Sequence, residues 1–271
     1  MHSQLSHQKQ AYDILLREAA AAVQAVAQDP AWVGGTVGIL VVLHTWSRTL
    51  TYHPHAHLLV TAGALAPDDS AWLKPAHARF LAPGYALSQV FRARLRAALN
   101  RAGLAAGLDP ALWNRKWVVH VQQIGRGEHA ALYLSRYVYR VALSNDRIER
   151  FANGEVTFRY THARTHETRR MTLPVDQFID RFLLHTLPRG FAKVRSYGLL
   201  SPGNGQKLER ARQILEQHAL TASPPPPAPI QTSGATAPDT IDTLTTGRCC
   251  PVCHAPHLLL VQRLRRSRAP P

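Results

Sequence analysis

The chain has 271 residues and a formal net charge of +15, from 32 Lys and Arg against 17 Asp and Glu. Its hydrophobic content of 45% is enough for a packed core, which excludes a disordered basic tail or a fibrous protein. Most of the cations are arginine, whose planar guanidinium suits bidentate phosphate contacts, so a nucleic acid is the first partner to consider.

The apolar segments are too short to cross a membrane. The longest, Val33 to Leu43, has 11 residues and is interrupted by glycines, whereas a spanning helix needs about 20 residues. The N-terminal segment lacks the apolar core and cleavage site of a secretory signal, so we expect a cytoplasmic location. The cysteines all lie between Cys249 and Cys253, which leaves the main body without disulfides.

The hydrophobic pattern predicts both helices and strands in the first half of the chain. An alanine-rich helix with one apolar stripe covers 8–30, and the β-branched run at 37–44 has the length of a buried central strand. A second strand covers 51–60, with Pro54 at its start or at a bulge because proline cannot donate to a ladder. The other elements expected here are a loop-like insert at 67–86, a helix at 87–104, a strand at 117–121 and a helical stretch at about 128–143.

The second half is expected to begin with a β-meander over 147–173, turned at Asn153-Gly154. Pro174 then opens a helix to Leu187. Its predicted buried face consists of Phe178, Ile179, Phe182, Leu183 and Leu187. A short helix covers 205–220, and the proline run that follows indicates an extended linker. The expected divisions are an N-terminal helix at 1–30, the main folded domain at 31–220, a Pro-rich linker at 221–247 and a basic tail containing Cys and His at 248–271.

The most informative cluster is the stretch His53-Pro54-His55-Ala56-His57. Side chains two apart on a strand share a face, so His55 and His57 present two imidazoles to one space, as a metal-chelating pair does. A histidine-rich surface turn is the alternative interpretation. Because His-x-His also occurs in amidohydrolase barrels and cupins, the pair alone selects no reaction.

A second cluster, Tyr133-Leu134-Ser135-Arg136-Tyr137-Val138-Tyr139-Arg140, combines tyrosines with arginines. If it is helical, Tyr133 and Tyr137 share one face at i and i+4. Core packing is the ordinary role of such tyrosines, but the neighbouring cations suit a phosphate ligand. These cations are Arg126, Arg136 and Arg140. The whole stretch 79–140 holds ten Lys and Arg against two acids, which concentrates positive charge around this cluster.

Together the two clusters suggest cleavage of a DNA phosphodiester by a tyrosine. A divalent ion on the His pair could neutralise the scissile phosphate while a phenol attacks phosphorus. The phosphotyrosine ester conserves the energy of the phosphodiester, so a strand can be rejoined without ATP, and a second tyrosine allows two linked transfers. A nuclease that uses water cannot rejoin strands.

Four segments, taken in order, carry a family resemblance. They are Leu43-His44-Thr45-Trp46, His53-Pro54-His55-Ala56-His57, Tyr133-Leu134-Ser135-Arg136-Tyr137 and His185-Thr186-Leu187-Pro188-Arg189-Gly190-Phe191. Over about residues 10–220 the chain resembles the two-tyrosine HUH transposases of rolling-circle bacterial insertion sequences. The resemblance implies an α+β fold, in which an antiparallel sheet flanked by helices carries the His pair and a nearby helix carries the tyrosines. A β-meander and helix extension and a disordered Pro-rich tail would follow.

The resemblance also implies a reaction and its participants. The enzyme would need Mg²⁺ or Mn²⁺, act on single-stranded DNA of the element ends and target, and form a covalent 5′-phosphotyrosine intermediate. It would be associated with the bacterial nucleoid. By the same resemblance His55 and His57 are metal ligands, and Tyr133 and Tyr137 are nucleophiles.

A third metal ligand and the DNA contacts are less sharply indicated. His44, at the end of the preceding strand, is the first choice of ligand, and the alternatives are Gln122, Gln123 and Glu128. The cations after the predicted helix at 174–187 have two interpretations: they contact the phosphates of the DNA backbone, or they form a solvated basic loop. The expected DNA-binding residues are Arg126, Arg136, Arg140, Arg189, Lys193 and Arg195.

The C-terminal cysteines look like half of a zinc knuckle. Cys250 and Cys253 have the two-residue gap of a zinc turn, and the alternative is a tail with unligated thiols. Members of the resembled family usually begin with a cysteine-rich zinc-binding module, but this chain has no cysteine before Cys249. We therefore expect that module to be missing or encoded elsewhere.

Other functions remain open at this point. A rolling-circle replication initiator would use the same chemistry, and a truncated remnant would bind DNA without cutting it. A metal hydrolase of small molecules would leave the basic stretch 79–140 and the paired tyrosines unexplained. The sequence gives no oligomeric state.

Overall fold

The structure is a computed structural model that describes residues 8–77, 81–125, 138, 141–162 and 165–221. The described residues belong to one compact unit in which helices accompany antiparallel sheets. The expected α+β class is therefore confirmed. None of the helices in these residues combines the length and the apolar character that a membrane span requires.

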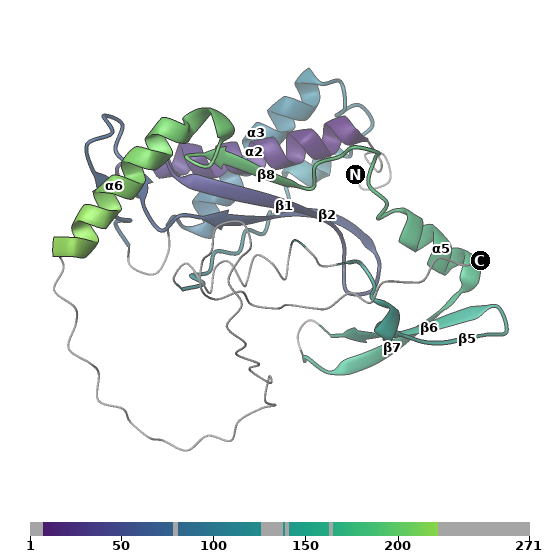
Figure 1. The fold of residues 1–271 in the computed structure, drawn as a ribbon. Coiled ribbons are helices and arrows are strands. Elements are labelled where there is room, and N and C mark those ends of the chain that lie inside the picture. The colour runs from purple at the N-terminus through teal and green to yellow at the C-terminus, as the bar shows by residue number, and fades with distance from the viewer. Residues whose placement is uncertain (1–7, 78–80, 126–137, 139–140, 163–164, 222–271) are drawn as a thin grey trace, which may run out of the picture. The chain divides into compact units, whose positions relative to one another are not determined.

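The central sheet has three antiparallel strands in the order β2-β1-β8 (Figure 1). Strand β1 (Gly38–Trp46) lies in the middle, as predicted, and β2 (Tyr52–Val60) confirms the second predicted strand. The third strand, β8 (Val194–Gly198), pairs with the first half of β1. It falls in a segment that the sequence pattern marked only as basic, so this strand was missed.

Helix α2 (Lys9–Gln28) covers one face of this sheet and confirms the predicted N-terminal helix. Its apolar stripe includes Tyr12, Leu16 and Ala20, which pack against alternate residues of β1. These strand residues are Ile39, Val41 and Leu43. Since side chains alternate along a strand, the even-numbered residues of β1, among them Val42 and His44, point to the opposite face.

Helix α3 (Gly84–Arg101) packs on α2 and begins and ends three residues earlier than predicted. The buried carboxylate of Glu18 on α2 accepts from Arg94 Nε of α3 at 3.1 Å and from Arg17 Nε at 3.2 Å. The predicted insert before α3 is not all loop. It contributes β4 (Trp72–Leu73), which pairs with β3 (Ala64–Leu65). The short 3-10 helix at Pro110–Trp113 follows α3.

The predicted strand at 117–121 is wrong, because the structure has no ladder there. The segment is not assigned to any helix or strand, and alternate residues are half-buried. Val119 and Val121 pack against a cluster that contains Val26 and Leu87, which belong to α2 and α3. The alternation of the sequence therefore reflects burial against helices rather than strand pairing. Most of the predicted helix at 128–143 lies outside the described residues, and 141–143 are not helical.

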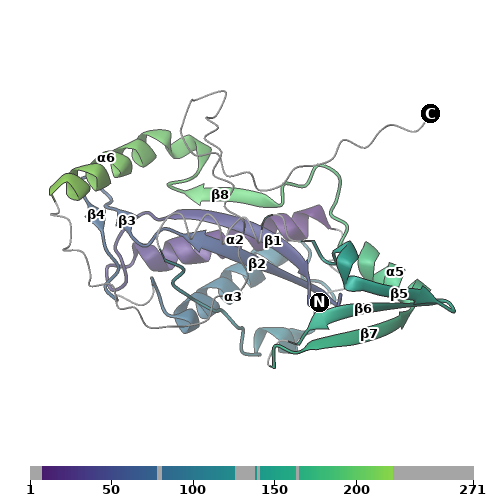
Figure 2. The same cartoon turned by 60° about the horizontal axis from the view of Figure 1, so that its bottom comes forward.

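The predicted β-meander is confirmed as a second antiparallel sheet (Figure 2). It consists of β5 (Ile148–Ala152), β6 (Glu155–Thr161) and β7 (Thr168–Pro174), preceded by a 3-10 turn at Asn145–Arg147. The hairpin turn also lies where predicted, since Asn153 and Gly154 have φ of 53° and 74°. Two successive positive φ angles are what a tight type I′ turn requires.

Helix α5 (Val175–Leu183) begins directly after Pro174 but ends four residues before the predicted end at Leu187. Its predicted buried face is partly wrong. Phe178 packs under the second sheet and Leu187 against the main core, whereas Ile179, Phe182 and Leu183 are 45%, 46% and 53% exposed. A 3-10 turn at Pro202–Asn204 leads into α6 (Gly205–Thr221), which confirms the last predicted helix. The predicted linker and tail lie outside the described residues, apart from Thr221.

Candidate functional site

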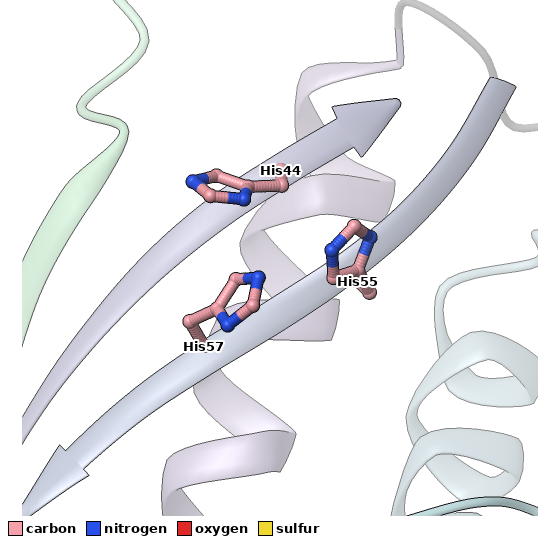
Figure 3. Close-up of side chains that lie close together, drawn as sticks. All are labelled: His44, His55 and His57. Carbon is pink, nitrogen blue, oxygen red and sulfur yellow. The ribbon is translucent and has the colours of Figure 1, made fainter. Parts of the chain in front are cut away.

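The register between β1 and β2 places three histidines on the sheet face opposite α2. His44 pairs with His55, and Val42 pairs with His57. Opposed residues of an antiparallel pair share a face, and so do residues two apart on one strand. Figure 3 shows the three imidazoles standing together on this face.

The spacing of these imidazoles suits a shared ion. One ring nitrogen from each of His44, His55 and His57 lies within 4.8 Å of the other two. A metal–imidazole bond is about 2.0–2.1 Å long, so small rotations of the side chains bring the three nitrogens onto one centre. His44 is buried, and the other two are half-buried, so part of the group is exposed to solvent. The residues present therefore fit a divalent metal ion.

The backbone sets the tautomer of His55. Its Nδ1 lies 2.7 Å from the carbonyl oxygen of His53, and a carbonyl only accepts, so Nδ1 carries the proton. Nε2 then carries the lone pair, and a hydrogen bond from the other ring nitrogen is what orients many histidine ligands of metals. His53 itself is exposed and does not belong to the three-histidine group.

A bulge next to the site explains the proline in β2. Two steps along β1, from His44 to Trp46, are matched by three steps on β2, from His55 to Tyr52. The extra residue falls in the stretch that contains Pro54, which confirms the predicted position of this proline at an irregularity.

Trp46 supports the buried histidine from the side. Its ring stacks on His44, with ring centres 4.6 Å apart and planes 18° apart. Lys193 Nζ lies 5.1 Å from the centre of the Trp46 ring and donates to the carbonyl oxygen of Val138 at 3.2 Å. Burial lowers the pKa of this lysine below its ordinary value. Lys193 therefore contacts both Trp46, which stacks on His44, and Val138, which follows Tyr137 in the sequence.

A second set of polar contacts fixes the strand ends behind the site. His185 Nε2 lies 3.1 Å from the carbonyl oxygen of Leu50, so it carries the proton, and Nδ1 accepts from Thr45 Oγ1 at 3.4 Å. The hydroxyls of Tyr12 and Tyr52 are 2.6 Å apart, and burial raises the pKa of Tyr52. His185 belongs to the segment 185–191, which carries part of the family resemblance. Its two hydrogen bonds connect β1, at Thr45, to the turn that follows β1, at Leu50.

The remaining predicted residues are placed as follows. Arg189 is exposed after α5, and Gln122 and Gln123 are exposed after the segment 117–121. Arg195 Nη2 pairs with Asp13 of α2, and its guanidinium lies 4.9 Å from the centre of the Phe191 ring. The other predicted site residues lie outside the described part of the chain: Tyr133, Tyr137, Arg126, Arg136, Arg140, Glu128, Cys250 and Cys253.

Sequence reasoning missed the supporting role of two residues. Trp46 carries a usable signal, because it stands two residues after His44 on a strand and so shares its face. Lys193 was considered only as a DNA contact. Its place over Trp46 depends on β8 returning beside β1, which no local pattern indicates.

Comparison with known proteins identifies the family. A family model described as "Putative transposase" matches residues 38–207. "Putative transposase y4qJ" of Sinorhizobium fredii (strain NBRC 101917 / NGR234) is 34% identical over 292 residues, which cover 96% of this chain and 69% of the relative. "Transposase for insertion sequence element IS801" of Pseudomonas savastanoi pv. phaseolicola is 30% identical over 212 residues, which cover 71% of this chain and 50% of the relative. No solved structure matches significantly. The chain belongs to this transposase family.

Proposed function

We propose that the chain cuts and rejoins single-stranded DNA by transesterification during rolling-circle transposition. The observation that carries the proposal is the group of three imidazoles on one sheet face, with nitrogens within 4.8 Å of one another, in a member of a transposase family. The metal ligands would be His44, His55 and His57, and the nucleophiles Tyr133 and Tyr137. The names of the relatives favour transposition over replication initiation.

Three neutral imidazoles are a suitable donor set for a divalent transition metal. They favour Mn²⁺ over Mg²⁺ in intrinsic affinity, since Mg²⁺ prefers oxygen ligands, although Mg²⁺ remains available through its abundance. When bound, the ion would polarise the non-bridging oxygens of the scissile phosphate and neutralise their developing charge. The phosphate would approach the ion beside the half-buried His55 and His57.

The chain's own part in the reaction is nucleophilic attack. A tyrosine Oη forms a bond to phosphorus, and the bond from phosphorus to the 3′ oxygen breaks. The phenol proton passes to solvent and the departing 3′ oxygen takes up a proton. The 5′ phosphate remains esterified to tyrosine, and attack by another 3′ hydroxyl restores a phosphodiester and releases the phenol. A second tyrosine lets a second strand be cut before the first ester is resolved.

The contacts of Lys193 support a role for Tyr137 at this metal site. The lysine donates to the carbonyl oxygen of Val138, the next residue, and lies over Trp46, which stacks on His44. A free phenol has a pKa of about 10, so the attacking tyrosine needs positive charge nearby. Arg136 and Arg140 would provide that charge together with the metal.

The test is the formation of a covalent protein–DNA adduct. Labelled single-stranded DNA that carries an element end is incubated with Mn²⁺ and the wild-type chain, or with Tyr133→Phe, Tyr137→Phe or the double variant. We expect adducts with the wild type, fewer with each single variant and none with the double variant. Tyr139→Phe is the matched control and should form adducts as the wild type does.

Two outcomes would contradict the proposal. Adducts that persist in the double variant would show that neither tyrosine is required as the nucleophile. DNA binding without nicking by the wild type, in the presence of Mn²⁺ and of Mg²⁺, would instead favour a non-catalytic remnant.

A further inference from the structure

A groove lies between α3 and the segment 116–119, and no step of the proposed reaction uses it. Its volume is about 520 Å³. One wall is the N-terminal half of α3, with Tyr85, Ser88 and Arg92, and the other is the segment with Lys116, Trp117 and Val118. The spacing of the α3 residues, at i, i+3 and i+7, places them on one face of the helix.

The groove belongs to the helical layer and not to the histidine site. Helix α3 packs on α2 through Ile14 and Leu99, and α2 packs on the face of β1 that carries Val41. The three histidines stand on the opposite face of that sheet. A ligand in the groove would therefore be held apart from the histidine site.

Specific contacts build both walls. Arg92 Nη1 donates to the carbonyl oxygen of Arg115 at 3.2 Å and so ties the segment to the helix. The Trp117 ring stacks on Trp113, with ring centres 5.7 Å apart, and Trp117 Nε1 donates to the carbonyl oxygen of Leu112 at 3.0 Å. These contacts hold the wall that contains Trp117 against α3 and the 3-10 helix at Pro110–Trp113.

The groove carries positive charge. Arg92, Arg115 and Lys116 belong to its walls or adjoin them, and within the described part of the chain no carboxylate forms an ion pair with these three cations. Arg94 differs, because its guanidinium is paired with the buried Glu18. An anionic ligand would complement this charge.

Exposed apolar surface accompanies the charge. Tyr85 is 68% exposed and Val118 is 88% exposed, although both are apolar residues beside cations. A polyphosphate ligand would contact only the cations and would leave this apolar surface unused. Single-stranded nucleic acid would use both, because its bases stack on aromatic rings while its phosphates contact Lys and Arg.

We propose that this groove binds a second stretch of single-stranded DNA, apart from the strand at the histidine site. A base would stack on Tyr85, and phosphates would lie at Arg92 and Lys116. The inference rests on the proposed function for its class of substrate, but it requires neither metal nor cleavage. It would allow the chain to hold two strand segments at once.

The test measures binding without cleavage. Fluorescence anisotropy with a labelled single-stranded oligonucleotide of about 30 nucleotides, in EDTA, compares the wild-type chain with Tyr85→Ala, Tyr85→Phe and Lys116→Gln. Stacking of one base is worth about 1–3 kcal/mol, so Tyr85→Ala should weaken binding by about five- to 150-fold, and Tyr85→Phe by less than about twofold. Lys116→Gln should reduce the slope of log affinity against log salt by about 0.7.

Arg101→Gln is the matched control for charge, because Arg101 lies on the same helix but does not line the groove. Equal losses for Arg101→Gln and Lys116→Gln would show a general effect of positive charge and overturn the proposal. Unchanged binding by Tyr85→Ala would also overturn it, as expected if a protein partner occupies the groove. If the wild type forms no covalent adduct but Tyr85→Ala still weakens binding, the cleavage proposal fails and the groove proposal stands.

Discussion

His44 and His55 face each other directly across β1 and β2, and the centres of their rings are 5.6 Å apart. Two adjacent strands thus deliver one imidazole each, and His57 adds a third from two residues further along β2. A group of side chains built on paired strands is held by ladder hydrogen bonds. Its geometry therefore depends on the register of the sheet more than on any single side chain.

Removal of one of these imidazoles should weaken metal binding sharply. For His44→Ala we expect the Mn²⁺ affinity to fall by more than about tenfold. Removing a residue that only hydrogen-bonds to a metal ligand already lowers metal affinity by about 10–100-fold, and His44 is a ligand in the proposal. Isothermal titration calorimetry measures the change. His53→Ala is the control, since His53 is a near neighbour outside the group, and its affinity should stay within about twofold of the wild type. Equal losses in the two variants would exclude His44 as a ligand.

Lys193 should act on the reaction by positioning rather than by binding DNA. Lys193→Met removes the hydrogen bond to Val138 and the cation over Trp46, but it leaves the three histidines intact. A misplaced reacting group can cost about 100-fold, so we expect adduct formation at saturating DNA and Mn²⁺ to slow by about tenfold or more. The affinity for Mn²⁺ and the salt dependence of DNA binding should not change.

Arg189→Gln is the comparison for Lys193→Met, because Arg189 is exposed and was also expected to contact DNA. If Lys193 instead grips a phosphate, its variant will lose DNA affinity at low salt while the rate at saturating DNA stays normal. That pattern would contradict the positioning role.

The sequence predicted those parts of the fold that local periodicity determines. The strand at 37–44 and the His-x-His pair were recognisable because side chains alternate along a strand. The segment 117–121 shows the same alternation, but Val119 and Val121 pack on helices and form no ladder. The periodicity of the sequence therefore indicates which residues are buried, but it does not distinguish burial within a sheet from burial against helices.

The missed features depend on contacts between distant segments. Strand β8 is short and mixes Val194 and Tyr197, which favour strands, with Arg195 and Ser196, so no clear local pattern marks it before it pairs with β1. The approach of Lys193 to Trp46 follows from that pairing. Helix α5 illustrates the reverse error, since Phe182 lies on its apolar stripe and yet is 46% exposed.

Buried Tyr52 should make the fold sensitive to alkaline pH. Burial raises the pKa of Tyr52 above its ordinary value near 10, so its contribution to stability is fully present below about pH 10 and is lost as the pH rises further. Tyr52→Phe removes both the hydrogen bond to Tyr12 and the titrating group. We expect it to cost about 1 kcal/mol at neutral pH and to lose less stability than the wild type above about pH 10.

Urea unfolding at neutral pH and at about pH 10.5 measures this effect. Tyr85→Phe is the control, because Tyr85 is 68% exposed, and this change should alter stability at neither pH. If the wild type and Tyr52→Phe lose equal stability between the two pH values, Tyr52 does not cause the alkaline sensitivity.

The end of β8 should require glycine at position 198, and replacing Gly198 should destabilise the fold. Its φ is +59°, and a Cβ added there would clash with the carbonyl oxygen of Val37, which accepts from Leu199 N at 3.0 Å. An L side chain in this conformation costs about 1–2 kcal/mol before any clash, so Gly198→Ala should lower the free energy of unfolding by more than about 2 kcal/mol.

Gly203→Ala is the control. An added Cβ there meets nothing within 4 Å, so this change should alter the free energy of unfolding by less than about 0.5 kcal/mol. Urea denaturation of the two variants gives the comparison. Equal stabilities would mean that the junction of β8 with β1 tolerates a shift, and the histidine site would then depend less on this register than the pairing of Gly38 with Gly198 implies.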